Sequence, residues 1–147
     1  RMYESFGETP SITEKMSSAM VKGLQYRGSY GVPVMSATSK HFAADGGTTW
    51  RTGVHGRIDR GIAPISAKEM NDIHLPAYKE AFNQNCLSVM ASYSSWQRPG
   101  IDAKNIPCHA NMNLLDSILR DTMQYDGVVI SDWDGIPQIN GFDNQRL

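Results

Sequence analysis

Asp132 is the residue of this sequence whose position best suits chemistry. It comes just after the apolar run Val128–Ile130, which is typical of a short strand buried in a parallel sheet. In parallel α/β folds, ligands bind at the carboxyl ends of the strands. A carboxylate there is held by stiff backbone and is partly dehydrated, so Asp132 is a candidate nucleophile or base. The alternative is an aspartate that caps the next helix or closes a turn. Trp133 is either a core residue or a flat platform for a sugar ring.

Other polar and aromatic side chains end the two earlier strands in the same way. Lys40 and His41 end the run 34–42, and Tyr93 ends the run 87–93. Because Lys40 and His41 are adjacent, they diverge on a regular strand, but a turn at its end lets both reach one polar ligand. The alternative is a solvated lysine beside a structural histidine.

The elements that must position these side chains alternate along the chain. Hydrophobic periodicity and breaker residues predict three helices, each followed by a strand. The helices are 11–24, 66–84 and 112–125, the strands are 34–42, 87–93 and 128–130, and residues 45–65 and 94–108 are long irregular loops. This order favours an α/β fold with a parallel sheet and crossover helices.

Two capping boxes mark predicted helix starts, one at 11–14 and one at 66–69. Pro76 lies inside the second helix and should kink or split it, because proline lacks the amide hydrogen. The side chains predicted to face inward from that helix are Met70, Ile73, Ala77 and Ala81. Those from the third helix are Leu114, Leu115, Ile118, Leu119 and Met123.

Composition excludes several classes of function. The chain has 147 residues, a formal net charge of −1, a pI of about 6.5 and 40% hydrophobic residues, which describes a globular protein with mixed charges. Nucleic acid and membrane are poor candidates for partners, since neither a strongly basic surface nor a membrane-spanning run is present. The length is below the roughly 200 residues of a complete eight-fold β/α barrel. The first residues do not have the pattern of a secretory signal.

Motifs of other enzyme classes are missing from the sequence. It has no GxSxG nucleophile elbow, no GxxxxGK[ST] phosphate loop and no GxGxxG. His55, His74 and His109 lack metal-ligand spacing, and we expect no metal or other cofactor. Cys86 and Cys108 make no disulfide framework and are expected to be buried or idle thiols.

The residues singled out above resemble glycoside hydrolase family 3, in its β-glucosidase and plant-type β-glucan exohydrolase branch. Five blocks in the family's order carry the resemblance. They are Arg1 with YESFGETP (3–10), KHFAADGG (40–47), the region 59–61, SVMASYSSW (88–96) and VVISDWDGI (128–136).

The resemblance implies a TIM-like (β/α)8 barrel, of which residues 1–147 would be a part, with strands upstream and a second domain downstream absent. It implies retaining hydrolysis of terminal non-reducing β-D-glucosyl residues of a β-glucoside or β-glucan oligosaccharide. Asp132 would be the nucleophile, and Trp133 would stack on the sugar or leaving group. The residues implied around the bound glucose are Arg1, Lys40, His41 and Tyr93. Cationic Lys40 and Arg1 would bind hydroxyl oxygens and keep the carboxylate ionised.

Some features depart from the family pattern. Thr9 replaces the aspartate of the common GEDP motif, and Gln138 falls where plant-type members often carry an arginine. The resemblance also implies an acid/base glutamate downstream of the SDW segment and an aspartate upstream of Arg1, both outside this chain. We therefore expect the chain alone to be inactive.

Two further hypotheses come from other classes. One is a carbohydrate-binding remnant that keeps Lys40, His41, Tyr93 and Trp133 but turns over nothing. The other is a lyase that uses Lys40 as a Schiff-base nucleophile at a barrel strand end. Glucose binding without hydrolysis would favour the first, and borohydride trapping of a carbonyl substrate on Lys40 would favour the second.

Overall fold

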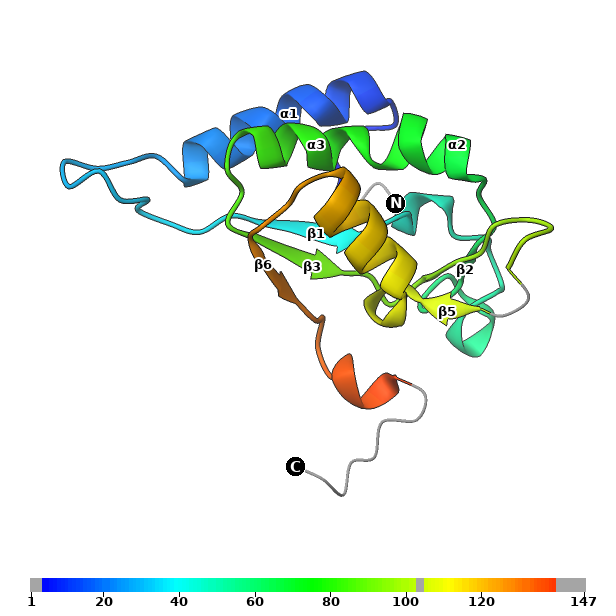
Figure 1. Ribbon diagram of the computed structural model, residues 1–147. Helices are drawn as coiled ribbons and strands as arrows, with labels where there is room; N and C mark the ends of the chain where they lie inside the picture. Colours follow the sequence, from blue (N-terminus) through cyan, green and yellow to red (C-terminus); the bar gives the residue numbers. More distant parts are fainter. Residues whose placement is uncertain (1–3, 103–104, 140–147) are drawn as a thin grey trace.

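The computed structural model describes residues 4–102 and 105–139, in which helices and strands alternate (Figure 1). The predicted order of helix, strand, helix, strand, helix, strand is confirmed. In chain order these elements are α1 (Pro10–Leu24), β1 (Thr38–Phe42), a helical segment made of α2 (Ala67–Glu69), η3 (Met70–His74) and α3 (Pro76–Asn83), then β3 (Ser88–Ala91), η5 (Asn113–Thr122) and β6 (Val128–Ile130).

The main sheet has the strand order β1-β3-β6, and both strand pairs are parallel. Its register aligns Thr38 with Ser88, and Ser88 with Val128. The pairing of β1 shifts between Ser39 and Phe42, so one extra residue of β1 is accommodated at its carboxyl end. Two peptide bonds in this stretch, Lys40–His41 and Phe42–Ala43, are cis. The irregularity falls where the site residues begin.

The helices that connect the strands pack close to this sheet. Figure 1 shows α1 and α3 side by side, with η5 crossing near β1 and β3. The Ser17 hydroxyl of α1 donates to the Ala77 carbonyl of α3 at 2.8 Å. In the part of the chain that the structure describes, no helix is long and apolar enough to span a bilayer.

The two predicted irregular loops contain a second small sheet, so they are more ordered than expected. Its strands are β2 (Ile62–Ala63), β4 (Ser95–Trp96) and β5 (Ile106–Pro107); β2 and β4 are parallel, and β4 and β5 are antiparallel. Two-residue strands are too short to show a period in the sequence. The same loops and the end of the described chain hold the short turns η1 (Asp45–Gly47), η2 (Val54–Gly56), η4 (Cys108–Ala110) and η6 (Ile136–Gln138).

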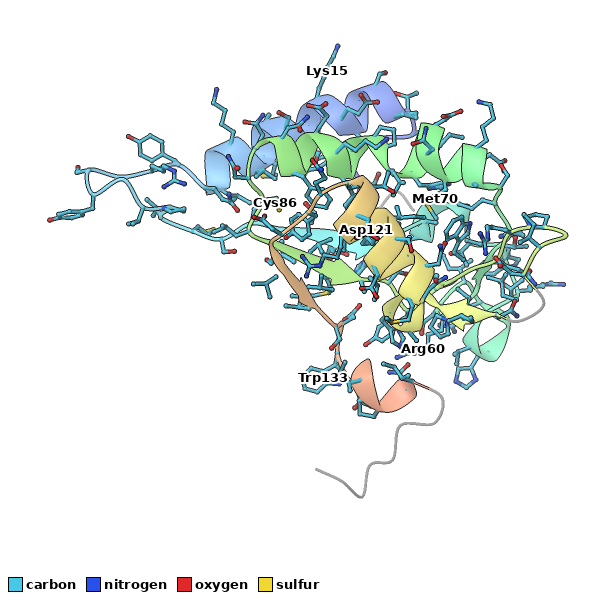
Figure 2. The ribbon with its side chains drawn as sticks, viewed as in Figure 1. Lys15, Arg60, Met70, Cys86, Asp121 and Trp133 are labelled. Atoms are coloured by element: carbon cyan, nitrogen blue, oxygen red, sulfur yellow. The ribbon has the colours of Figure 1, made fainter. Side chains whose placement is uncertain are left out.

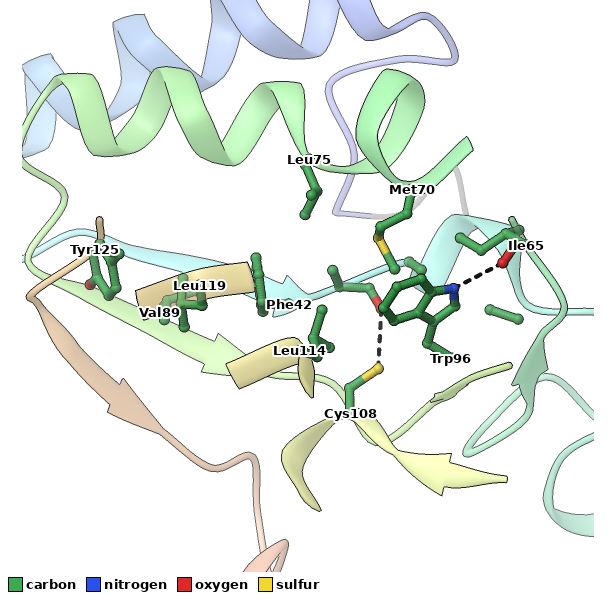
Figure 3. Packing of buried hydrophobic residues seen from close by; sticks show 13 residues of the cluster. Phe42, Ile65, Met70, Leu75, Val89, Trp96, Cys108, Leu114, Leu119 and Tyr125 are labelled. Carbon is green, nitrogen blue, oxygen red and sulfur yellow. Dashed lines mark hydrogen bonds between the residues drawn. The ribbon is translucent and has the colours of Figure 1, made fainter. Parts of the chain in front are cut away.

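The core lies between the main sheet and its helices (Figure 3). Phe42, Met70, Val89, Leu114 and Leu119 are its largest fully buried apolar side chains. At one end of the core, the indole nitrogen of Trp96 donates to the Ile65 carbonyl at 2.9 Å, and the Cys108 thiol donates to the Ala43 carbonyl at 3.4 Å. Both cysteines are free and buried, as predicted. Burial raises the pKa of the Cys108 thiol to about 11.

The first helix begins earlier than the sequence predicted. Its N-cap is Thr9, with Pro10 in the first turn, and no side chain caps it, so the predicted box at 11–14 is wrong. Proline has the helical φ and lacks an amide hydrogen that would need a partner, so it favours a start at position 10. The helix buries Val21, whereas Met16 and Met20 stay 44% and 46% exposed.

The second capping box is confirmed. The Ser66 hydroxyl accepts from the Glu69 amide, and the Glu69 carboxylate accepts from the Ser66 amide. Pro76 splits the helix as predicted: the π-helical turn η3 precedes it, and α3 restarts at Pro76. The wider π turn changes which side chains face inward. Leu75 is buried and Ile73 is 50% exposed, so the inward placement predicted for Ile73 is wrong.

Two strand predictions need correction. The strand predicted from residue 34 begins at Thr38. The residues before Thr38 hydrogen-bond to the segment that follows α1 instead of to the sheet, since the Val34 amide donates to the Tyr26 carbonyl at 3.0 Å. The run Val128–Ile130 was predicted to be buried on both faces, but Val128 is 61% exposed. Among the described residues β6 lies at one edge of the main sheet, where no further strand pairs with it.

Candidate active site

Three side chains predicted to act together meet at the carboxyl ends of the main sheet. His41 lies in the irregular end of β1, Tyr93 lies two residues after β3, and Asp132 lies two residues after β6. All three line one pocket of about 120 Å³. They converge because parallel strands end at the same edge of a sheet.

The His41 imidazole lies between two carboxylates. Its Nδ1 is 3.2 Å from the Asp45 Oδ2, and its Nε2 is 3.4 Å from the Asp132 Oδ2. The side chains of His41, Asp45 and Asp132 are only 18%, 19% and 24% exposed, so these contacts are partly shielded from water. The other Asp132 oxygen, Oδ1, accepts the Trp133 amide at 2.6 Å. Both oxygens of the candidate nucleophile are therefore oriented by neighbouring groups.

Lys40 lies in a neighbouring pocket rather than beside Asp132. Its ammonium forms an ion pair with the Glu4 carboxylate at 3.2 Å, and it lines a pocket of about 480 Å³. His41 and Asp45 line both pockets, so the two spaces adjoin. The structure thus places Lys40 in the space next to the one that holds the candidate nucleophile.

Of the predicted site residues that remain, Trp133 does not line the smaller pocket. Trp133 is 85% exposed and points outward from the turn after β6 (Figure 2). The stacking role predicted for Trp133 would require a ligand that approaches from that open side. Arg1 lies outside the described residues.

The structure adds Arg60 to the site, a residue that the sequence analysis did not single out by itself. Its guanidinium carbon lies 4.3 Å from the centre of the Tyr93 ring, which is a cation–π contact. Its Nε donates to the Gln138 side-chain oxygen at 2.9 Å, and its Nη1 pairs with Asp59 at 2.6 Å. Arg60 therefore joins the end of β3 to the turn after β6.

The pKa of the Tyr93 hydroxyl is raised above 10.0. Partial burial is the main cause and the negative charge of Asp132 adds to it, while the positive charge of Arg60 acts in the opposite direction. Tyr93 therefore stays a neutral hydroxyl that can donate a hydrogen bond to a bound ligand.

Asp45 and Ser92 also line the pocket, and sequence reasoning placed neither of them there. The Ser92 hydroxyl donates to the Asp45 carboxylate. The sequence predicted Asp45 at the start of a long irregular loop, but Asp45 begins the turn η1 and has this partner besides His41. The only sequence feature that could have suggested a contact between His41 and Asp45 is their separation by four residues.

His109 supports the site from behind Tyr93. Its ring meets the Tyr93 ring edge-on at 5.9 Å between centroids, and its Nδ1 donates to the Ser92 carbonyl at 3.2 Å. The described residues hold no group of three or more His, Cys, Asp or Glu side chains that could bind a metal ion. The arrangement is that of a partly dehydrated carboxylate beside hydrogen-bonding groups, which suits nucleophilic attack on a polar substrate.

Comparison with known proteins defines the class to which this fold and site belong. A family model described as the glycosyl hydrolase family 3 N terminal domain matches residues 1–146. The chain belongs to glycosyl hydrolase family 3, as its motifs indicated.

Curated relatives are glycoside hydrolases. A beta-xylosidase from Formosa agariphila is 33% identical, over 90% of this chain and 17% of its own length. A lysosomal beta glucosidase from Dictyostelium discoideum is 27% identical, over 95% of this chain and 16% of its own length. The chain thus spans about a sixth of the length of these relatives.

Solved structures share the fold. A variant of the exo-1,3/1,4-beta-glucanase from a Pseudoalteromonas species has a TM-score of 0.79 and 35% identity, over 96% of this chain and 21% of that one. The beta-glucosidase from Listeria innocua, in complex with glucose, has a TM-score of 0.73 and 30% identity, over 90% of this chain and 17% of that one. The predicted α/β fold, part of a TIM-like barrel, is confirmed.

Proposed function

We propose that this chain carries the nucleophile of a retaining β-glycosidase, and that the nucleophile is Asp132. Its carboxylate would attack the anomeric carbon of a terminal sugar, displace the leaving group and form a covalent glycosyl-enzyme, which water then hydrolyses. The observation that carries the proposal is the contact of Asp132 with His41 at 3.4 Å, at the end of β6 and inside the pocket.

The proposed substrate is a β-glucoside or β-glucan oligosaccharide with a terminal glucosyl residue. The Listeria innocua beta-glucosidase, which this chain resembles, has been solved with glucose and with laminaribiose. Relatives also include beta-xylosidases, so xylosides are the natural comparison substrate. We propose that His41 and Tyr93 bind sugar hydroxyls, together with Lys40 from the adjoining pocket and Arg1. Trp133 would stack on the sugar or the leaving group.

We further propose that residues 1–147 are part of an N-terminal barrel domain whose general acid comes from another segment. Retaining catalysis needs two carboxyl groups about 5 to 5.5 Å apart, one of which protonates the leaving oxygen. The nearest other acids of the pocket are already engaged, Asp45 by His41 and Ser92, and Asp59 by Arg60. The chain alone should therefore hydrolyse ordinary aryl glucosides at close to the background rate.

A Schiff-base lyase receives no support from the site. A lysine nucleophile needs a dehydrated amine, or one beside another cation. The Lys40 side chain is instead 41% exposed and paired with the acidic Glu4.

The test uses a 2-deoxy-2-fluoro-β-D-glucoside with a dinitrophenolate leaving group, which departs without protonation. The purified chain should gain one fluoroglucosyl group, and peptide mapping by mass spectrometry should place it on Asp132. Asp132→Asn keeps the size but removes the charge, so it should gain none. The xyloside analogue, run in parallel, compares the two sugars. A label on another residue would overturn the proposal by reassigning the nucleophile. An unlabelled wild type would overturn it and favour a binding remnant.

A further inference from the structure

We propose that Asp45 is a positioning residue for the nucleophile, and that it acts through His41 and is itself held by Ser92. This inference rests on the proposed function and adds a second carboxylate to it. The four residues form a continuous series of contacts, Ser92 to Asp45, Asp45 to His41, and His41 to Asp132, which we term the imidazole bridge.

The backbone orients the Ser92 hydroxyl, and the chemistry of the carboxylate fixes the direction of the first contact. The Ser92 Oγ accepts the Ser94 amide hydrogen at 2.9 Å. Because a carboxylate only accepts, the hydroxyl proton of Ser92 is directed to the Asp45 Oδ1. Ser92 is 1% exposed, so water does not compete for this contact. One oxygen of Asp45 is thereby fixed at the end of β3.

The other oxygen of Asp45 orients the imidazole. A carboxylate only accepts, so the contact of Asp45 Oδ2 with the His41 Nδ1 requires a proton on Nδ1. This contact fixes the rotation of the ring and turns Nε2 toward Asp132. The contact of Nε2 with the Asp132 carboxylate likewise requires a proton on Nε2, so without Asp45 the ring keeps only that contact and Nδ1 loses its acceptor.

The bridge connects all three strands of the main sheet at their carboxyl ends. His41 lies on β1, Ser92 follows β3 and Asp132 follows β6. The neighbour of His41, Phe42, is completely buried, so the β1 end of the bridge is anchored in the core. Asp132, in contrast, follows β6, none of whose three residues is buried. Through these contacts, the imidazole bridge holds the Asp132 carboxylate in place relative to the core.

The first experiment measures which nitrogens of the His41 ring carry a proton, and it does not depend on turnover. Nitrogen-15 NMR of the four histidines, with His41 identified from a His41→Gln spectrum, reports which ring nitrogen carries a proton. The wild type should show a protonated Nδ1 on His41. Asp45→Ala should lower the fraction of rings with a proton on Nδ1, because only the Asp132 carboxylate, at Nε2, then remains beside the ring, and Asp45→Asn, which keeps an acceptor, should fall between. Asp121→Asn, an exposed change of the same charge, should leave it unchanged.

The second experiment reads the nucleophile through the rate of fluoroglucosyl labelling. Asp45→Ala should slow labelling of Asp132 by about 10-fold to 100-fold, the range expected for a displaced reacting group. Ser92→Ala should act in the same direction and more weakly. Should Asp45→Ala fail to fold by circular dichroism, Asp45→Asn and Ser92→Ala carry the test.

The outcomes separate the two proposals. A wild type that takes no label overturns the proposed function, while the ring spectra still decide whether Asp45 fixes His41. A labelled wild type with an unchanged rate in the Asp45 and Ser92 variants overturns this inference alone. An unchanged His41 spectrum in Asp45→Ala overturns it as well.

Discussion

The two walls of the smaller pocket are held in different ways. The β1–β3 wall is made of His41, Asp45 and Ser92, and Phe42 beside it is fully buried. It is joined internally by the hydrogen bond from Ser92 to Asp45 and by the 3.2 Å contact of Asp45 with His41. The β6 wall, residues 131–139, follows a strand that has no buried residue. Its main side-chain connection to another segment, besides His41, is the 2.9 Å bond between Arg60 and Gln138. The proposed nucleophile lies on the less firmly held wall, so its position depends on contacts that cross the pocket.

The largest expected effect is a loss of stability when the core beneath the β1–β3 wall is changed. Phe42 is 0% exposed and meets the Tyr78 ring edge-on at 5.0 Å. Phe42→Ala should cost about 3–5 kcal/mol of the free energy of unfolding, because it leaves a cavity in the core. Trp133→Ala, on the exposed β6 wall, should change it by about 0.5 kcal/mol or less. Urea unfolding followed by circular dichroism measures both, and similar losses would show that the walls are equally supported.

The next largest effect is a loss of stability when the loop that carries Arg60 is displaced. A Cβ on Gly61 would lie 2.6 Å from the Thr48 Cγ2 and 2.9 Å from the Ile58 carbonyl oxygen, so Gly61→Ala must displace the loop. We expect a loss of about 1–3 kcal/mol in stability, typical of overpacking. Gly46→Ala is the matched control, since a Cβ there would meet nothing within 4 Å. Equal unfolding midpoints for the two variants would contradict this prediction.

A smaller and more local effect should follow from Gln138→Ala. Loss of its bond to Arg60 should cost the β6 wall about 1 kcal/mol, or roughly a fivefold rise in local amide exchange. Gln138→Glu should instead slow exchange there, because its carboxylate makes a charge-assisted bond to the guanidinium. Hydrogen exchange by mass spectrometry of peptides covering 131–139 tests both, with peptides covering 88–92 as the internal reference. Unchanged exchange in Gln138→Ala would show that the bond does not hold this wall.

The smallest effect is a dependence of stability on pH at the larger pocket. Burial is the main cause that lowers the pKa of His74 from 6.5, and the charge of Glu69 acts in the opposite direction. The folded protein therefore binds this proton less readily than the unfolded chain does. His74 thus destabilises the fold as the pH falls below 6.5, and has no such effect above that value. His74→Gln should reduce the difference in urea midpoint between about pH 7.5 and about pH 5.5. A difference equal to that of the wild type would contradict this assignment.

The sequence by itself determined the order of the elements, because helical periodicity, the capping box at 66–69 and the break at Pro76 are local properties of the chain. It also determined that His41, Tyr93 and Asp132 follow strands, and the parallel arrangement then brought them to one pocket.

Only the tertiary structure decided which groups touch Asp132. The bridge through His41 to Asp45 and the approach of Arg60 to Tyr93 depend on loop conformations, which no period in the sequence encodes. The exposure of Val128 was decided in the same way, because burial depends on what covers a strand and not on its hydrophobicity alone.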